Sequence, residues 1–230
     1  MLPSRDQLAE LPLLHQRIIA VFVAALRLRL GLPLADAPST CRLCHVVEAD
    51  VHGHHTLCCL HLGMRTRAHD RLRNEVQALA KRSLLTPGGE ARPFSTDPGA
   101  RMDVVLVKEG VFHLLDTAII FPLALQHRTH AATKSGGAAT NYEAKKHQRY
   151  GPVIAREPNP AAFKLIPLVV DMFGAWGDAA LPAITVLAHA WALRVDLPRS
   201  VAISLAFHRL NFTVIKAVAS LATTNQRPRG

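Results

Sequence analysis

The stretch RMDVVLVKEGVFHLLDTAII, residues 101–120, decides the fold of this chain. Two runs of apolar and β-branched residues meet at Lys-Glu-Gly, where Gly110 allows a tight connection, so they predict an antiparallel β-hairpin. Each run also carries an aspartate, Asp103 or Asp116, in a segment that otherwise reads as buried strand. An ionised carboxylate is costly to bury unless it is paired or bound to a metal. The hairpin is therefore also a candidate functional site.

The segments around this hairpin predict helices and one further strand. Helices are expected over 5–31, 66–85, a segment from after Gly137 to 150–152, 176–195 and 198–222. Apolar residues recur with a helical period in 66–85, and the segment after Gly137 is Ala-rich and then charged. The run FKLIPLVVDMFG, residues 163–174, reads as another strand. This order predicts an α+β (α/β) fold in which a small mixed β-sheet is flanked by helices.

The expected domain organisation follows the same order of segments. An N-terminal helix is followed by a Cys/His module, a core that contains the hairpin, and a C-terminal helical extension. The boundaries that we expect for these four parts are 1–35, 36–65, 66–175 and 176–230.

Composition and charge indicate a globular protein with a polyanionic partner. Hydrophobic residues make up 49% of the 230 residues, which is enough for a substantial core. The net charge is +10 and the pI is near 10.1, a balance that suits nucleic acid; a basic but otherwise ordinary surface is the alternative. Arg17, Arg27 and Arg29 interrupt the apolar N-terminal run, which predicts an amphipathic core helix and no membrane partner. The first ten residues lack the basic start of a secretory signal, so we expect an intracellular protein, nuclear in a eukaryote. A mitochondrial presequence is the alternative, because Arg-rich amphipathic helices serve there too.

The stretch CRLCHVVEADVHGHHTLCC, residues 41–59, holds all four cysteines and predicts a zinc site. Cys41 and Cys44 form a Cys-x2-Cys pair, a spacing at which one turn can direct both thiolates to a single Zn²⁺. Spacing favours His54 and Cys59 as the second pair of ligands, and the substitutes are His52, His55 and Cys58. A site with four protein ligands is closed, so its role is structural. In the alternative interpretation Cys58 and Cys59 are small core residues and the histidines lie on the surface.

The two aspartates of the hairpin predict a second metal site. Twelve residues separate Asp103 from Asp116, and in a hairpin that spacing can bring both carboxylates to one end of neighbouring strands. Two converging carboxylates repel each other unless a hard cation such as Mg²⁺ lies between them. The segment NYEAKKHQRY, residues 141–150, supplies Lys145, Lys146 and Arg149 as cationic partners. Alternatively, Asp103 is a strand-edge residue and Asp116 an N-cap or salt-bridge partner.

Taken together, these motifs resemble a known family. The succession of Cys-x2-Cys, GHHTLCC, RTRAHDRLR, RMD, LLDTA and YEAKKHQRY is similar to the zinc knuckle and C-terminal restriction-like endonuclease of site-specific retrotransposons without long terminal repeats. That nuclease belongs to the PD-(D/E)XK superfamily. The resemblance covers about residues 25–180 and includes VVDMFGAWG. Met102 stands where the family has proline, Thr117 and Ala118 follow the second aspartate where many relatives have an acid and a lysine, and Arg149 replaces a lysine.

The resemblance implies a restriction-endonuclease-like core and metal-dependent cleavage of DNA, with the element's RNA as an alternative partner. Asp103 and Asp116 would coordinate Mg²⁺ or Mn²⁺, and Lys146, four residues before Tyr150, would orient the water or stabilise the phosphate. Glu75 lies where this superfamily often places a supporting acid. Contacts with the DNA backbone are expected from Arg67, Arg71, Lys145 and Arg149, and from other basic residues of the 66–85 helix.

Two other functions remain as hypotheses beside the endonuclease. The first is a catalytically inactive zinc-knuckle protein of the same descent that binds nucleic acid. The second is a structural, partner-binding helical protein in which the Cys/His block only holds the fold together.

Overall fold

The computed structural model describes residues 13–59, 63–83, 85, 87–88 and 90–224. The chain divides into two compact units, of which the first comprises Met1–Arg65 with Ile215–Gly230 and the second comprises Thr66–Val214. The protein is mixed α and β, with a small sheet flanked by helices, as the sequence predicts.

The second unit is built on a three-stranded sheet of order β3-β4-β5, made by β3 (Val104–Lys108), β4 (Val111–Ile120) and β5 (Phe163–Asp171). β3 and β4 are antiparallel, which confirms the predicted hairpin. Its turn residues, Glu109 and Gly110, have φ angles of 53° and 77°, the left-handed pair that a two-residue hairpin turn requires. β5 runs parallel to β4, and the connection between them contains α5 (Arg128–Ala131), α6 (Gly137–Ala155) and the short 3₁₀ helix η2 (Pro160–Ala162).

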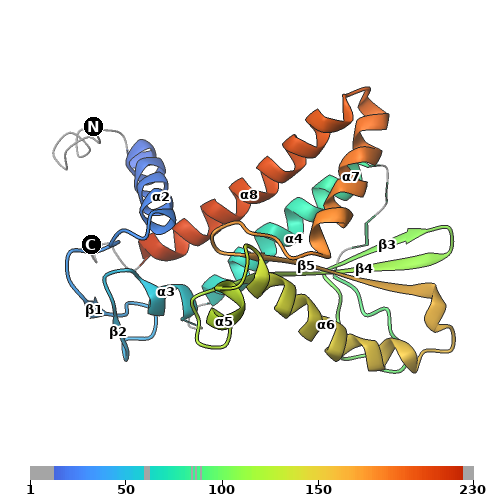
Figure 1. Ribbon diagram of the computed structural model, residues 1–230, viewed down its shortest axis with the longest axis horizontal. Coiled ribbons are helices and arrows are strands. Elements are labelled where there is room, and N and C mark those ends of the chain that lie inside the picture. Colours follow the sequence, from blue (N-terminus) through green and yellow to red (C-terminus); the bar gives the residue numbers. More distant parts are fainter. Residues whose placement is uncertain (1–12, 60–62, 84, 86, 89, 225–230) are drawn as a thin grey trace. The chain divides into compact units, whose positions relative to one another are not determined.

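Helices cover both faces of this sheet. Figure 1 shows α6 on one side, and α4 (Met64–Arg82) and α7 (Ala180–Val195) on the other. Successive strand residues point to opposite faces, so Val105, Leu114 and Val169 share one face. Val105 and Leu114 pack with Tyr150 of α6, and Val169 packs with the first turn of the same helix. α6 is thereby anchored along its length to the face that also carries Asp116.

The end of α6 differs from the predicted one for a physical reason. α6 continues through Pro152 to Ala155, past the expected end at 150–152, because Val153 is buried in the core beside Phe94. That burial outweighs the hydrogen bond that the proline removes near the end of the helix. α2 covers Leu13–Arg29, whereas the expected start at residue 5 lies outside the described residues. Pro167 is accommodated within β5 because β5 is an edge strand of the described sheet.

The first unit contains α2 and a small Cys/His module. β1 (Ser39–Thr40) and β2 (Glu48–Ala49) form a short antiparallel hairpin, which is followed by α3 (His54–Cys58). The buried centre of the module contains two cysteines and two aliphatic side chains, namely Cys41, Leu43, Ala49 and Cys59. An apolar centre this small is a reason to look for a metal.

The last helix, α8 (Arg199–Thr224), is long and apolar enough by length and composition to cross a membrane. A core helix of a globular protein passes the same test, and one face of α8 is buried, including Ala202, Ala206 and Leu210. The predicted absence of a membrane partner stays a prediction.

Candidate functional site

The hairpin brings Asp103 and Asp116 to the same place. The ladder pairs Val104 with Leu115, so the two aspartates occupy the next opposed positions at the end of the hairpin. Opposed residues of an antiparallel pair project from one face with Cβ atoms about 4.5–5.5 Å apart. Both residues are buried, with only 8% and 5% of their surface exposed. This end of the hairpin therefore carries two buried carboxylates.

Lys146 of α6 is the partner of Asp116. Its Nζ lies 2.7 Å from Oδ2 of Asp116, and the two side chains are 14% and 7% exposed. Burial raises the pKa of Asp116, and the charge of Asp103 acts in the same direction, while Lys146 lowers it; the pKa stays above its ordinary value. The ammonium therefore offsets only part of what it costs to keep this carboxylate ionised inside the fold.

His69 of α4 and Thr117 of β4 are the partners of Asp103. Its Oδ2 accepts hydrogen bonds from the Thr117 N–H at 2.6 Å, the Thr117 hydroxyl at 2.8 Å and His69 Nε2 at 3.0 Å. Burial acts to raise the pKa of Asp103, but the bonds from His69 and Thr117 bring it below its ordinary value. The hydrogen bond to Asp103 raises the pKa of His69. Each of the two side chains therefore favours the charged form of the other.

We refer to Asp103, Asp116, Lys146, His69 and Thr117 as the acidic cluster. Within the described residues, the hydrogen bonds and ion pairs of both aspartates go to Oδ2, which leaves Oδ1 of each as an acceptor for a cation. Carboxylate oxygens are the ligands that Mg²⁺ prefers, so the two aspartates are of the chemical type that holds a divalent ion. Lys146 and His69 also give each carboxylate a partner without one.

Glu75, the expected supporting acid, is not brought into the acidic cluster. It follows His69 by six residues on α4, which turns it about 240° around the helix axis. There its Oε1 accepts from Arg209 Nε at 2.7 Å and from Arg82 Nη1 at 3.5 Å. In the structure Glu75 forms an ion pair between α4 and α8, and its expected catalytic role stays a prediction.

The four expected DNA-contacting residues form two exposed pairs. Arg67 and Arg71 lie four residues apart on α4, and Lys145 and Arg149 lie four residues apart on α6, so each pair occupies one helix face. The Arg149 guanidinium lies 5.0 Å from the centre of the Tyr150 ring. Burial, together with the charge of Asp116, raises the pKa of Tyr150 to about 12, so its hydroxyl remains a neutral donor, bonded to the carbonyl of Arg101 at 3.4 Å.

A second cluster, the Cys/His group, comprises Cys41, Cys44, His55 and Cys59. Their ligand atoms all lie within 4.8 Å of one another. Cys44 Sγ is 3.3 Å from His55 Nε2, close to the roughly 3.6 Å that tetrahedral Zn–S and Zn–N bonds impose. Three thiolates and one imidazole form a donor set that fits structural zinc.

Backbone groups of the knuckle prepare its sulfurs to be thiolates. Cys41 Sγ accepts from the Leu43 N–H at 3.4 Å. The N–H groups of Val47 and Val46 lower the pKa of the Cys44 thiol to about 6. A thiol must lose its proton to bind a metal, so these bonds favour the form that ligates.

The structure corrects one predicted ligand. His55, which the sequence offers only as a substitute, faces the three sulfurs in place of His54. Gly53 adopts a left-handed conformation (φ 73°) and α3 begins directly after it, so consecutive histidines point about 100° apart. His54 instead lies 3.6 Å from the Asp50 carboxylate and stacks on His52. Cys58 is likewise outside the group.

Sequence reasoning missed two members of the acidic cluster. His69 falls within the motif RAHD but received no role, and Thr117 was considered only as a departure from the family pattern. A signal for His69 was present, because it lies three and seven residues before the buried Leu72 and Val76, on the same helix face. Nothing in the local sequence predicts the hydrogen bonds that Thr117 donates to Asp103.

Comparison with known proteins does not place the chain in a family. No protein-family model matches it, and no curated protein matches its sequence. Its function is therefore inferred from the chemistry of the acidic cluster and the Cys/His group.

Proposed function

We propose that this chain is a metal-dependent DNA endonuclease with a restriction-endonuclease-like core of the PD-(D/E)XK type. The observation that carries the proposal is the opposed pair Asp103 and Asp116, with the Lys146 ammonium 2.7 Å from Asp116. Two acids and a lysine around one point are the groups that hydrolysis of a phosphodiester needs. The antiparallel hairpin, the parallel third strand and the helix that carries Lys146 are in keeping with such a core.

Each residue of the acidic cluster has a role in this proposal. Asp103 and Asp116 would hold Mg²⁺ or Mn²⁺ through their carboxylates. The ion, when bound, supplies an activated water and neutralises charge that develops on the scissile phosphate. Lys146, now 2.7 Å from Asp116, would donate to the attacking water or to a phosphate oxygen. His69 and Thr117 hold the Asp103 carboxylate in one orientation.

The exposed basic pairs supply the contacts with DNA. Arg67 and Arg71 on α4, and Lys145 and Arg149 on α6, contact backbone phosphates. Such contacts position a duplex without reading its sequence, and they make binding strongly dependent on salt. The Cys/His group holds structural zinc, because four protein ligands leave no open position for chemistry.

A second candidate is a catalytically inactive protein that binds nucleic acid, either DNA or the RNA of the retrotransposon from which it would descend. The observation that favours it is the internal balance of the acidic cluster. Asp116 pairs with Lys146 and Asp103 with His69, so the fold keeps both carboxylates without a metal. A cluster that is complete in this way can serve stability alone.

Nicking of supercoiled plasmid distinguishes the two candidates. With Mg²⁺ present, we expect wild type to nick DNA, and Asp116→Asn and Lys146→Met to lose about a hundredfold or more of that activity. Asp178→Asn is the matched control, because this exposed aspartate pairs with Lys134 outside the cluster. All variants should retain salt-dependent DNA binding in a gel-shift assay. Equal nicking by wild type and Asp116→Asn would refute the nuclease, and so would DNA binding by wild type without nicking. Absence of both nicking and DNA binding in wild type would refute both candidates.

A further inference from the structure

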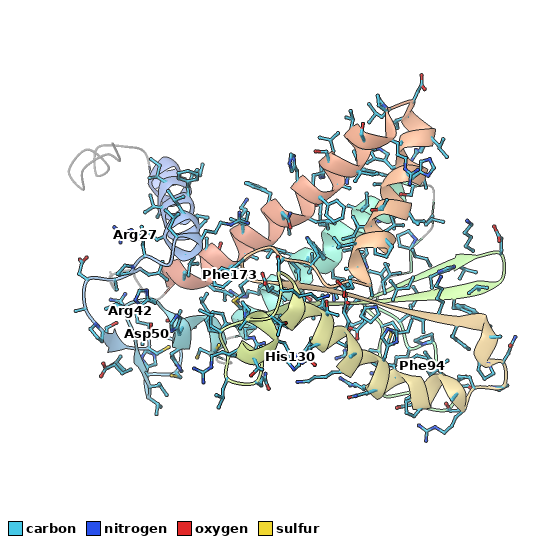
Figure 2. The ribbon with its side chains drawn as sticks, in the orientation of Figure 1. Arg27, Arg42, Asp50, Phe94, His130 and Phe173 are labelled. Carbon is cyan, nitrogen blue, oxygen red and sulfur yellow. The ribbon has the colours of Figure 1, made fainter. Side chains whose placement is uncertain are left out.

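An apolar pocket of about 390 Å³ lies between the sheet and α7, within the second unit. Most of its strand residues project from the face of the sheet opposite to Asp116, because side chains alternate along a strand. The face with Asp116 is filled, since Phe94, labelled in Figure 2, packs there with Leu114 and with Tyr150 of α6. The pocket is therefore separate from the acidic cluster and shares no residue with it.

Apolar side chains form the two walls of this pocket. On the sheet, Leu106, Leu115 and Ile166 share one face, and the two leucines are buried. On α7 the wall residues recur at helical spacing along one side of the helix, namely Pro182, Ala183, Val186 and Leu187. A pocket with such walls takes an apolar ligand, or the apolar part of one.

The polar residues of the pocket gather at one end, toward the tip of the β3–β4 hairpin. In the sheet register His113 lies beside Lys164, two residues from the apolar Leu115 on the same strand. Lys108 belongs to the last residue pair before the turn, two residues further toward the tip. At about 3.4 Å per strand residue, about 14 Å separate the level of Leu115 from that of Lys108. The pocket is thus apolar at its inner end and cationic at its outer end.

The outer end carries a positive field. Burial lowers the pKa of His113, and the charges of Lys164 and Lys108 lower it further, while Glu109 acts against them. Glu109 lies 3.7 Å from Lys108, and both of these side chains are exposed to solvent. One carboxylate therefore faces two lysines, and the outer end is complementary to an anion.

We infer that this pocket binds a free medium-chain fatty acid as its carboxylate. The alkyl chain lies against Leu115, Ile166 and the α7 wall, and the carboxylate lies at the outer end, near Lys164 and Lys108. The span of about 14 Å sets the length of the chain at about that of decanoate. Binding here is independent of the cleavage of nucleic acid.

Other classes of ligand fit this arrangement less well. A phosphate or a nucleotide would place polar groups against Leu115 and Ile166, and an uncharged chain would gain nothing from the two lysines. A lipid with two chains would need more room than one pocket of this volume. A protein partner normally contacts about 20–30 residues. The residues that line the pocket number 13.

Equilibrium dialysis of the full chain against hexanoate, octanoate, decanoate and tetradecanoate tests the inference, with decanol as the uncharged counterpart. We expect the affinity to rise about fourfold with each methylene up to decanoate, because each buried methylene adds a similar gain, and then to level off. Decanol should bind about tenfold more weakly than decanoate. Equal affinities for decanoate and decanol would point to an uncharged ligand, and no binding of decanoate would point to a partner chain. Either result would overturn the inference, as would an unbroken rise in affinity to tetradecanoate.

Two pairs of variants locate the ligand. Val186→Glu adds a negative charge to the α7 wall at a side chain that is 66% exposed, so the fold is kept and decanoate should bind about tenfold more weakly. Leu193→Glu is the matched control, because this side chain is 77% exposed, lies about two turns further along the same helix and is outside the pocket. Lys164→Gln should weaken the binding of decanoate about fivefold, whereas Lys216→Gln, at an exposed position on α8, should not change it. Equal affinities for decanoate within either pair would contradict the inference.

His113 reports the position of the carboxylate. A carboxylate at the outer end acts against the charges of Lys164 and Lys108, so decanoate should raise the pKa of His113. NMR of the ring protons as a function of pH measures this pKa, and His113→Gln identifies the signal. An unchanged pKa with decanoate bound would contradict the inference. Nicking activity bears on none of these outcomes.

Discussion

The Lys146 ammonium lies 2.7 Å from Oδ2 of Asp116, at a point where the two side chains are only 14% and 7% exposed. This ion pair joins α6 to the central strand of the sheet. A divalent cation bound by the two aspartates would compete with Lys146 for Asp116. The same contact can therefore be the metal-free state of a nuclease or a permanent structural ion pair, and metal-dependent activity separates these two roles.

The energetics of this pair are testable apart from catalysis. Lys146→Met leaves the Asp116 carboxylate buried without its partner, so we expect the free energy of unfolding to fall by about 3 kcal/mol. In the double variant with Asp116→Asn the uncompensated charge is gone, and most of the loss should be recovered. Urea unfolding of both variants without divalent ions measures this. Equal destabilisation of the single and double variants would show that Lys146 does not act through Asp116.

Zinc content should distinguish two adjacent histidines. We expect His55→Ala to lose bound zinc, because His55 faces the three sulfurs, while His54→Ala should keep one zinc per chain. Elemental analysis after dialysis gives the stoichiometry, and His54→Ala is the matched control. Retention of zinc by His55→Ala together with its loss from His54→Ala would instead support the ligand set that spacing alone favours.

Stability should depend on pH through His69. Because its pKa in the folded protein is raised above 6.5 by Asp103, the protonated ring is favoured by folding. The contribution is complete below pH 6.5 and is lost as pH rises through the raised folded-state pKa. Asp103 has the opposite pH dependence, because folding lowers its pKa. Its contribution to the free energy of unfolding is complete above pH 3.8 and is lost as the pH falls through the lowered pKa.

The His69→Gln variant isolates that dependence. Unfolding free energies of wild type and variant, measured from about pH 5 to about pH 9, should differ most at the acid end and converge toward the alkaline end. A constant difference over this range would show that the charge of His69 does not contribute.

Gly177 should tolerate no side chain. A Cβ at this position would lie 2.3 Å from the carboxyl carbon of Glu143. That carboxylate accepts the N–H groups of Ala179 at 2.9 Å and Ala180 at 3.1 Å, at the start of α7. Displacing Glu143 leaves buried N–H groups unpaired, so Gly177→Ala should lose about 2 kcal/mol of stability.

A second glycine of the same unit provides the control for that variant. Gly151 lies within α6, and a Cβ there would meet nothing within 4 Å. Gly151→Ala should be neutral or slightly stabilising, because alanine is the better helix former. Thermal unfolding compares the two; equal losses of stability would indicate a general effect of replacing glycine.

The sequence by itself determined the local elements of this protein. Two runs of apolar and β-branched residues joined at a Glu-Gly turn are enough for the β3–β4 hairpin, and helical periodicity is enough for α4 and the C-terminal helices. The hairpin register also places Asp103 opposite Asp116, because that relationship follows from strand geometry alone. The Cys-x2-Cys spacing likewise predicts a metal-binding site.

Only the tertiary structure decided which side chains meet. His69 reaches Asp103 from 34 residues away, and Glu75 turns instead toward Arg209, 134 residues away. The choice of His55 over His54 depends on the backbone of Gly53 and on how α3 packs against the knuckle. Local patterns reflect dihedral preferences that each short segment satisfies alone. Partners of buried charges are settled only when elements from distant parts of the chain pack together, because burial is what makes a missing partner costly.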